Sequence, residues 1–551
     1  MDTQRHPRES GGTASAAREE YDLIVVGGGS AGCAMAGRLA ERGDISVLLI
    51  EAGRSDKHLF TRLPAANVNA VLNPAFDWCF KVEPDESING RAETWPAARV
   101  LGGGSAINGM MYIRGHRWDY DNWAELGATG WDYESVLPYF RRLERNERGE
   151  DAYRGGGGPL SVSEGRAGYP ITDAWIEAAT QAGIKRSPDL NGAEAEGVDY
   201  VQVSQRRGMR HSSATAYIWP NIRRRNLSLE LNTQVQRVLF EGRRATGVLV
   251  RGPDGRSRAI HARAGVVISS GTINSPRLLM LSGVGDAREL SALGIAPVHH
   301  LPGVGRNLQD HVGTHLVNDV DTTTLNSEVA GLGVVRHVAR FLASRRGALT
   351  TAIGHAQAFV ATREGLPAPN VQLIFAPFAF DYGEDCRIRL RNVPSVSTAV
   401  AIMRPKSRGT ITLASPDPDI APVIRHQLLG DPDDVEQMVE GIEMARRIIA
   451  QPATARFIRG EVRPQSAPGD RDALRAYVRG FSSSFYHQVG TCRMGVDDLA
   501  VVDPDLKVHG IDGLWVADAS VIPSLSAGNT NATAIMIGDK GSDHVIRATR
   551  N

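Results

Sequence analysis

The chain has 551 residues, which is enough for two or three domains of ordinary size, and 42% of them are hydrophobic. Its 62 Lys and Arg residues are matched by 62 Asp and Glu residues, so the sequence lacks the positive excess on which phosphate-driven nucleic-acid binding depends. We therefore expect a globular protein that does not bind nucleic acid.

The cysteines and the first residues indicate the expected cellular setting. Cys33, Cys79, Cys386 and Cys492 are scattered without CxxC spacing, which argues against a disulfide framework and a paired zinc site. Residues 1–20 are polar and charged without the apolar core of a signal peptide, and no run of 18 apolar residues occurs. The sequence thus predicts a disordered tail at 1–20, no transmembrane segment and a cytoplasmic location.

The first motif in chain order is a βαβ unit between Asp22 and Gly53. An apolar strand runs into a turn that matches G-x-G-x-x-G, a pattern that directs backbone N–H groups and a helix dipole toward a pyrophosphate. Glu51 ends the second strand, where its carboxylate can accept both ribose hydroxyls and repels the 2′-phosphate of NADP. The unit therefore favours an adenine dinucleotide. Its three motif glycines are Gly27, Gly29 and Gly32.

A second glycine cluster, RVLGGGSAING, follows at residues 99–109. Gly102, Gly103 and Gly104 allow the main chain to approach a ligand closely, and Ser105 and Asn108 add polar groups beside it. Two separate glycine-lined surfaces predict an extended cofactor that is held along its length. This suits FAD better than a nicotinamide that must come and go, and an ordinary structural loop is the alternative.

The remaining chain predicts further strands and helices. Apolar stretches between residues 227 and 270, separated by turn signals at Gly242 and Gly252–Gly255, are typical of meander strands. The stretch from 316 to 400 contains a helical pattern and two apolar strands without a phosphate loop, and we interpret it as a cap that shapes a pocket. Helical patterns follow at 431–450 and from Asn531 onward.

His487, within FYHQVGTCRMG, has three possible roles. A zinc site needs three or four ligands, and Cys492 with the distant His509 is a thin supply. A neutral imidazole can instead accept or donate a proton during catalysis. For a histidine taken in isolation, a place in the core is the default interpretation.

These ordered motifs resemble the glucose-methanol-choline (GMC) flavoprotein oxidoreductases, in particular the choline-dehydrogenase-like branch of alcohol dehydrogenases and oxidases. The resemblance runs from about Asp22 to Ile546. It is carried by IVVGGGSAG with Glu51, RVLGGGSAING, SGTINSPRLLMLSGVG, LPGVGRNLQDH, PKSRGTITLASPDP, YHQVGTCRMG and VADASVIPSLSAGNTNATAIMIGDK. Several blocks in this order are far more specific than any one glycine motif.

The resemblance implies an α/β fold in two parts: a Rossmann-like FAD-binding domain and a substrate domain with an antiparallel sheet and flanking helices. Residues 21–316 are expected to form mainly the FAD domain, with a substrate-domain insertion near 130–200. Residues 317–480 are expected to form mainly the substrate or cap domain. Residues 481–551 would return to the FAD domain and carry the catalytic His and Asn.

The resemblance also implies oxidation of a primary or secondary alcohol by hydride transfer to flavin N5, with His487 and Asn529 at the ring. His487 would be the base that accepts the hydroxyl proton, and Asn529 would hold the same oxygen by a donated hydrogen bond. FAD is expected to be noncovalent, because Ile107 stands where some relatives carry the histidine that attaches it. The helix opening near Asn531 would direct its N–H groups at the flavin C2 carbonyl, or Asn531 would serve only as an N-cap. The expected FAD contacts are Gly27, Gly29, Ser30, Ala31, Gly32, Glu51, Trp78, Gly103, Gly104, Ser105, Asn108, Val235, Asp518, Ala519 and Asn531.

Several alternatives stay open. The electron acceptor is either oxygen or a quinone-like or dye-like compound, and no metal is expected. Some relatives on this scaffold are hydroxynitrile lyases or a light-driven fatty-acid decarboxylase, and a non-enzymatic flavin scaffold is a third hypothesis. A loose match puts His355 where choline-oxidising relatives place a carboxylate, which disfavours choline; His311 is treated as structural. Aromatic residues that line either a pocket or the core are Phe375, Phe378, Phe380, Phe485 and Tyr486.

Overall fold

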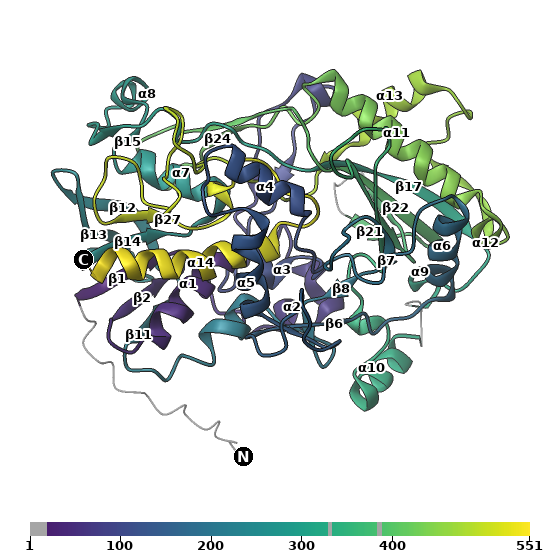
Figure 1. Cartoon of the computed structure of the whole chain (residues 1–551), viewed down its shortest axis with the longest axis horizontal. Coiled ribbons are helices and arrows are strands. Elements are labelled where there is room, and N and C mark those ends of the chain that lie inside the picture. Colours follow the sequence, from purple (N-terminus) through teal and green to yellow (C-terminus); the bar gives the residue numbers. More distant parts are fainter. Residues whose placement is uncertain (1–18, 329–332, 383–387, 551) are drawn as a thin grey trace, which may run out of the picture.

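The computed structural model describes residues 19–328, 333–382 and 388–550, so the tail expected at 1–20 lies almost entirely outside the described residues. Two seven-stranded sheets dominate the described part, one in each half of the molecule (Figure 1). One half is built around a mainly parallel sheet and the other around an antiparallel sheet, which confirms the two-part α/β architecture.

The first sheet has the order β11-β2-β1-β14-β13-β12, and β27 pairs with β14. β12 (Gln234–Glu241) and β13 (Arg244–Arg251) extend it as an antiparallel hairpin against β14. Continuous apolar runs such as VLLI in β2 suit strands that are covered on both faces. The strands of the parallel part are β1 (Glu20–Val26), β2 (Val47–Ile50), β11 (Leu227–Glu230), β14 (Ser257–Ile268) and β27 (Leu514–Val516).

The prediction that β11 belongs to a meander is wrong. β11 pairs in parallel with β2, from Leu227 opposite Val47 to Glu230 opposite Ile50. The pattern of β-branched residues identifies a strand but not its partner, and parallel partners are distant in sequence. β14 joins both arrangements, because its first half pairs with β13 and its second half pairs in parallel with β1.

α1 (Ser30–Glu41) and α14 (Asn531–Arg550) lie side by side on this sheet although they come from opposite ends of the chain (Figure 1). The helices approach closely, because a Cβ atom at Gly538 would overlap the carbonyl oxygen of Ala31. Arg38 Nε lies 2.7 Å from Asp539 Oδ2 and adds an ion pair whose carboxylate is buried. α14 therefore closes the half of the molecule that is built around the first sheet.

The second sheet is antiparallel, with the order β25-β17-β22-β19-β18-β7, and β26 pairs with β17. α6 (Pro170–Gln181) and α11 (Pro432–Ile449) cover one face. Phe375 stacks on Trp175 there at 5.2 Å between ring centroids, so it belongs to the core. The strands are β7 (Gly197–Tyr200), β17 (Val312–Val320), β18 (Ala356–Val360), β19 (Val371–Ala376), β22 (Ser395–Ile402), β25 (Ile458–Arg463) and β26 (Ser483–Ser484).

The border that the sequence analysis sets after residue 316 falls inside β17, which starts at Val312. The sequence NVNAVLN at 67–73 has a helical pattern, but the structure has a 3-10 helix, Pro64–Asn69, that starts at a proline and ends before this stretch does. The other helices that matter below are α3 (Gly104–Ile107), α7 (Gly271–Leu281), α10 (Gly333–Ser344) and α13 (Arg471–Phe481).

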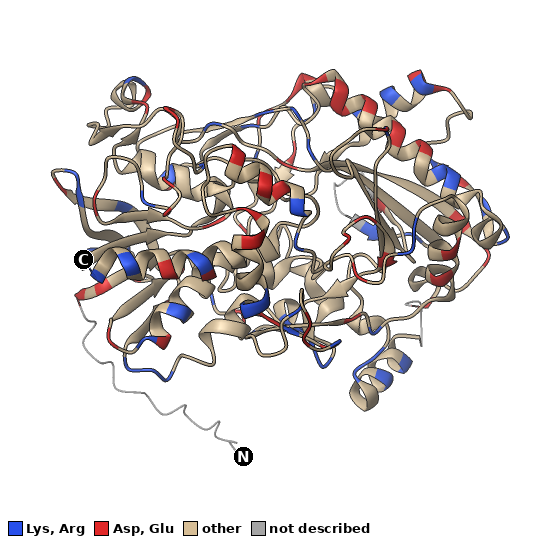
Figure 2. Cartoon of the chain, viewed as in Figure 1, with Lys and Arg blue, Asp and Glu red and all other residues tan. Residues whose placement is uncertain are grey.

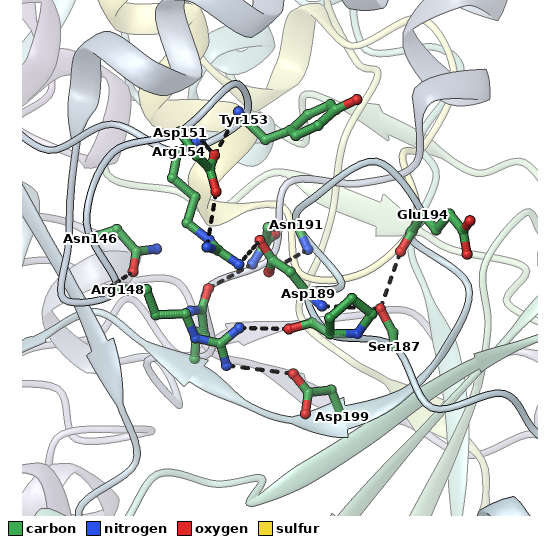
Figure 3. A network of polar contacts seen from close by, with 12 residues as sticks. Asn146, Arg148, Asp151, Tyr153, Arg154, Ser187, Asp189, Asn191, Glu194 and Asp199 are labelled. Atoms are coloured by element: carbon green, nitrogen blue, oxygen red, sulfur yellow. Dashed lines mark hydrogen bonds and ion pairs between the residues drawn. The ribbon is translucent and has the colours of Figure 1, made fainter.

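A polar network ties the insertion to the segment that follows the second glycine cluster (Figure 3). Arg154 Nη2 lies 2.6 Å from Asp189 Oδ2, and Arg148 Nη2 lies 3.6 Å from Asp199 Oδ2. Asn191 then reaches the main chain of that segment through both ends of its amide. The arginines therefore compensate the negative charges of Asp189 and Asp199, which indicates that this network has a structural role.

Charged residues of both signs are interspersed along the helices of both halves (Figure 2). Within 19–328, 333–382 and 388–550, no helix is both long enough and apolar enough to cross a membrane.

The contact between α1 and α14 generates a stability prediction. Gly538→Ala should destabilise the protein by about 1–3 kcal/mol, because the added methyl group must displace the Ala31 carbonyl. Gly480→Ala in α13 is the matched control, since its Cβ would meet only Asn89 Nδ2 at 3.8 Å and alanine favours helix. Thermal unfolding measures both variants, and equal melting temperatures for the two would contradict the packing argument.

Candidate active site

The first glycine turn is held tightly beneath the start of α1. Gly27 has φ +100°, and a Cβ atom there would lie 2.5 Å from the carbonyl oxygen of Ser269. Gly32 faces back onto Gly27, whose carbonyl oxygen a side chain at Gly32 would overlap. α1 begins after Gly29, which has no side chain to cap the first N–H groups. These N–H groups and the helix dipole are therefore left to an anionic ligand.

The second glycine cluster sits directly on the first turn. Gly102 N donates to Gly28 O at 2.7 Å, and a Cβ atom at Gly103 would lie 2.5 Å from Gly29 Cα. Gly104 is different, because a Cβ atom there would have no described atom within 4 Å apart from its chain neighbours. The two clusters thus form one glycine-lined cradle with tight contact on one side and open space at Gly104.

Three of the residues expected at the cofactor are joined by hydrogen bonds at the mouth of this cradle. Ser30 Oγ donates to Asn531 Oδ1 at 2.7 Å, and Ser105 N donates to Ser30 Oγ at 3.3 Å. α14 begins at Asn531 as predicted. Ser30 therefore links the starts of α1, α3 and α14 at one point, and Ala31 next to it holds α14 through its contact with Gly538.

Glu51 lies under the same turn and is buried. Its Oε2 accepts from Gly28 N at 2.9 Å and its Oε1 accepts from Gly53 N at 2.7 Å. Burial raises the pKa of the Glu51 carboxyl, while the two backbone bonds oppose that rise. The Glu51 side chain thus stabilises the turn, and each carboxylate oxygen keeps a further lone pair that can accept from a ribose hydroxyl.

Several other expected residues have clear structural partners. Asp518 Oδ2 accepts from Gly271 N at 2.8 Å at the start of α7, and its Oδ1 accepts from Ser520 N at 2.8 Å. Asn108 Oδ1 accepts from Arg210 Nη1 at 2.7 Å and from Met110 N at 3.0 Å, so the oxygen of this side chain has protein partners.

The last three residues that were expected to contact FAD are Trp78, Val235 and Ala519. Trp78 stacks on Phe80 at 6.0 Å between centroids and lies under the guanidinium of Arg99. Val235 is half-buried on β12, and Ala519 O accepts from the backbone of the segment that carries His487.

His487 and Asn529 meet across a long sequence separation. His487 Nε2 lies 3.0 Å from Asn529 Nδ2, and Asn529 is two residues before α14. Burial lowers the pKa of His487 to about 4, so the imidazole is neutral at neutral pH and can accept a proton. Asn529 Oδ1 is buried and has no hydrogen-bond partner among the described residues. An orphaned buried oxygen at this point indicates that a bound molecule completes the site.

The stretch Asn307–His311 holds both of these segments, and we call it the brace. Asp310 Oδ1 accepts from His487 N at 2.8 Å, and Asp310 Oδ2 accepts from Gln488 Nε2 at 3.0 Å. Gln309 Nε2 donates to Pro523 O at 3.1 Å, on the segment that leads to Asn529. Burial raises the pKa of Asp310 to about 7. The brace thereby holds the segments of His487 and Asn529 at a fixed distance from each other.

The sequence did not reveal that His311, at the end of the brace, contacts the ring of His487. Its Nδ1 lies 2.9 Å from His487 Nδ1, and its side chain is fully buried. The signal that was available is its position in LQDH, one of the motifs that carry the family resemblance.

The zinc hypothesis has no support in the described residues. Within these residues no group of three His, Cys, Asp or Glu side chains could hold a metal ion. Cys492 is buried, and burial raises the pKa of its thiol. His509 Nε2 lies 3.0 Å from the carbonyl oxygen of Gly495.

Comparison with known proteins gives the class. Family models described as "GMC oxidoreductase" match residues 21–313 and 405–538. The chain is 40% identical over 548 residues to choline dehydrogenase, mitochondrial, of Mus musculus, covering 98% of this chain and 91% of that protein. It is 38% identical over 534 residues to oxygen-dependent choline dehydrogenase of Brucella suis, covering 96% of each.

Solved structures agree with this. Pyridoxine 4-oxidase from Mesorbium loti superposes with a TM-score of 0.85 at 28% identity, covering 95% of this chain and 98% of that one. Formate oxidase superposes with a TM-score of 0.88 at 26% identity, covering 97% and 99%. The protein is an FAD-dependent oxidoreductase that acts on CH–OH donors. It belongs to the GMC oxidoreductase family.

The open space at Gly104 generates a prediction about cofactor binding. Gly104→Ala should fold as well as the unaltered protein without FAD but bind FAD at least ~10-fold more weakly, because the methyl group would occupy cofactor space. Gly157→Ala is the control, since a Cβ there also has no described atom within 4 Å. Flavin fluorescence titration of the apoproteins measures both affinities, and equal affinities would remove Gly104 from the cofactor site.

Proposed function

We propose that the protein oxidises a primary or secondary alcohol to the carbonyl compound, with His487 as the proton acceptor. The observation that carries this proposal is the neutral imidazole of His487, whose Nε2 lies 3.0 Å from Asn529 Nδ2 next to the start of α14. The glycine cradle and the uncapped start of α1 fit the pyrophosphate of FAD. FAD, when bound, supplies the acceptor for the hydride from the carbinol carbon.

The chain's own residues would act on the hydroxyl group. When the alcohol binds, its O–H replaces Asn529 Nδ2 as the donor to His487 Nε2, and Asn529 Nδ2 donates to the alcohol oxygen instead, so the oxygen is held between the two side chains. As hydride leaves the carbon, the hydroxyl proton moves to Nε2, and the C–O bond becomes a carbonyl. Asp310 keeps the main chain of His487 in place during this transfer, because its carboxylate accepts a hydrogen bond from His487 N.

FAD would be held without a covalent bond. Ile107, in α3 next to the cradle, has a buried apolar side chain with no nucleophilic atom. The electron acceptor that reoxidises the flavin is a separate property, and the residues above favour neither oxygen nor a quinone-like compound.

The identity of the alcohol is part of the proposal. Two relatives are named choline dehydrogenases, which makes choline the first compound to consider. Strand alternation puts His355, Gln357 and Phe359 on one face of the second sheet, opposite the face that α6 and α11 cover. Phe359 belongs to a small apolar cluster on which Phe485 packs, two residues before His487. This face therefore adjoins the base.

The charges on this face do not favour a cation. Burial lowers the pKa of His355 to about 4, so its ring is uncharged. The carboxylates that share the face are paired with arginines: Asp199 with Arg186, and Asp319 with Arg391. A trimethylammonium group would lose hydration here without gaining a counter-ion. We therefore propose an uncharged alcohol in preference to choline.

One prediction of the proposed function concerns His487. His487→Ala should lower the rate of anaerobic flavin reduction by alcohol about 10²- to 10⁴-fold while FAD stays bound, because the proton acceptor is lost. His544→Gln is the control, since His544 is also a buried histidine but pairs with Asp505 near the end of α14. Stopped-flow absorbance of the flavin measures the rate, and an unchanged rate in His487→Ala would contradict the proposal.

The same assay separates the alternatives on this scaffold. A hydroxynitrile lyase or a non-enzymatic flavin scaffold would leave the flavin oxidised after anaerobic addition of every alcohol in a panel. A light-driven decarboxylase would act on fatty acids only under illumination. We expect bleaching in the dark.

Another prediction of the proposed function concerns the charge of the substrate. Choline and 3,3-dimethylbutan-1-ol have the same shape, but a carbon atom replaces the charged nitrogen in the latter. We expect the uncharged alcohol to reduce the flavin with at least ~10-fold higher kcat/KM, because it pays no cost for an uncompensated charge. Faster reduction by choline would overturn the substrate class while leaving alcohol oxidation intact.

A further inference from the structure

His311 is the one buried histidine that contacts the ring of His487 within the described part of the chain. Its Nδ1 lies 2.9 Å from His487 Nδ1, and the two ring planes are nearly perpendicular at 86°. Its other nitrogen, Nε2, lies 3.2 Å from the carbonyl oxygen of Met403. The two imidazoles thus form a chain of hydrogen bonds that starts at the carbonyl oxygen of Met403 and ends at Asn529.

This chain has a fixed direction because a carbonyl oxygen can only accept. His311 Nε2 must therefore carry its proton and donate it to Met403 O, and a neutral His311 then has a bare Nδ1. His487 Nδ1 must donate to that bare nitrogen, so His487 Nε2 has no proton. The bare Nε2 accepts from Asn529 Nδ2, which leaves Asn529 Oδ1 as the atom without a described partner.

The opposite tautomer fails at both ends of the chain. A proton on His487 Nε2 would point at the Asn529 amide nitrogen, and a bare His487 Nδ1 would need a proton from His311 Nδ1. A neutral His311 would then direct the lone pair of Nε2 at the lone pairs of Met403 O. Two buried contacts that were hydrogen bonds would become repulsive, and buried polar atoms would be left without a partner.

We infer that His311 is a positioning residue that locks His487 in the tautomer whose Nε2 is bare and faces the alcohol. The inference rests on the proposed function, because a bare Nε2 matters only if His487 accepts a proton. The role is that of the third group in a catalytic triad, which holds the base in one tautomer, but here the group is a neutral imidazole.

A neutral third group has a consequence for acidity. Once His487 has taken a proton, its Nδ1–H still donates to His311, but His311 offers no negative charge to stabilise the imidazolium. The titratable and charged groups packed around the pair are Asp310, which binds the His487 main chain and whose pKa burial raises to about 7, and Arg404, which is paired with Asp119. The ring of His315 lies 6.1 Å, between centroids, from the ring of Phe485, which is two residues before His487. Burial is the main cause that lowers the pKa of both His311 and His487, so both stay neutral at neutral pH.

Three substitutions at position 311 separate the lock from simple packing. Asn places an amide oxygen at the same number of bonds from Cβ as Nδ1, so His311→Asn keeps a neutral acceptor for His487 Nδ1. His311→Leu has a similar size without an acceptor. His311→Asp keeps the acceptor and makes it negative, which should raise the pKa of His487.

The experiment measures the rate of anaerobic flavin reduction against pH by stopped flow for these variants in FAD-loaded enzyme, with FAD content and melting temperature recorded. We expect His311→Leu to be at least ~100-fold slower and His311→Asn to lie within ~10-fold of the unaltered enzyme. We expect the acidic limb of the profile to move to higher pH by at least ~1 unit in His311→Asp.

The outcomes distinguish the lock from the proposed function. Equal losses in His311→Leu and His311→Asn would mean that position 311 only fills space, and this would overturn the lock. An unaffected His311→Leu beside an inactive His487→Ala would also overturn it while the proposed base stands; an active His487→Ala would instead remove the proposed function. If His311→Leu does not fold, an unshifted acidic limb in His311→Asp relative to His311→Asn overturns the lock.

Discussion

The site depends on the brace, the short stretch Asn307–His311 that binds two distant segments at once. Its side chains hold the main chain around His487 on one side and the segment that leads to Asn529 on the other. Buried polar groups of this kind are costly unless each finds its partner, so the network allows only one relative position of the two segments. The distance of 3.0 Å between His487 Nε2 and Asn529 Nδ2 follows from this constraint.

The cofactor half contributes a second constraint, which is the absence of side chains where backbones touch. The two glycine clusters meet at Gly29 and Gly103, and α14 closes on α1 at Gly538. These contacts bring the start of α14, and with it Asn529 and Asn531, to the mouth of the cradle. A protein assembled in this way joins its first helix, its last helix and the brace in the middle of the chain at one site.

Local patterns in the sequence were enough to predict the βαβ unit, the two glycine clusters and a helix that opens at Asn531, because each depends on neighbouring residues. The pairing of β11 with β2 and the start of β17 at Val312 could not be predicted in this way, because strand partners are set by packing between distant segments. Phe375 was ambiguous for the same reason, since only the sheet reveals which face it occupies. The contact between His311 and His487 could not be predicted, because an isolated histidine gives no sign of the ring that it contacts.

A crystal structure of the protein with FAD bound tests the central claim most directly. The account predicts that the diphosphate lies over the glycine cradle and that the flavin ring packs beside Asn529, with His487 Nε2 facing the space above the ring. It also predicts that Met403 O, His311, His487 and Asn529 keep the order of contacts described above. A flavin ring that lies out of reach of His487, or a His487 ring turned so that Nδ1 no longer meets His311, would contradict it.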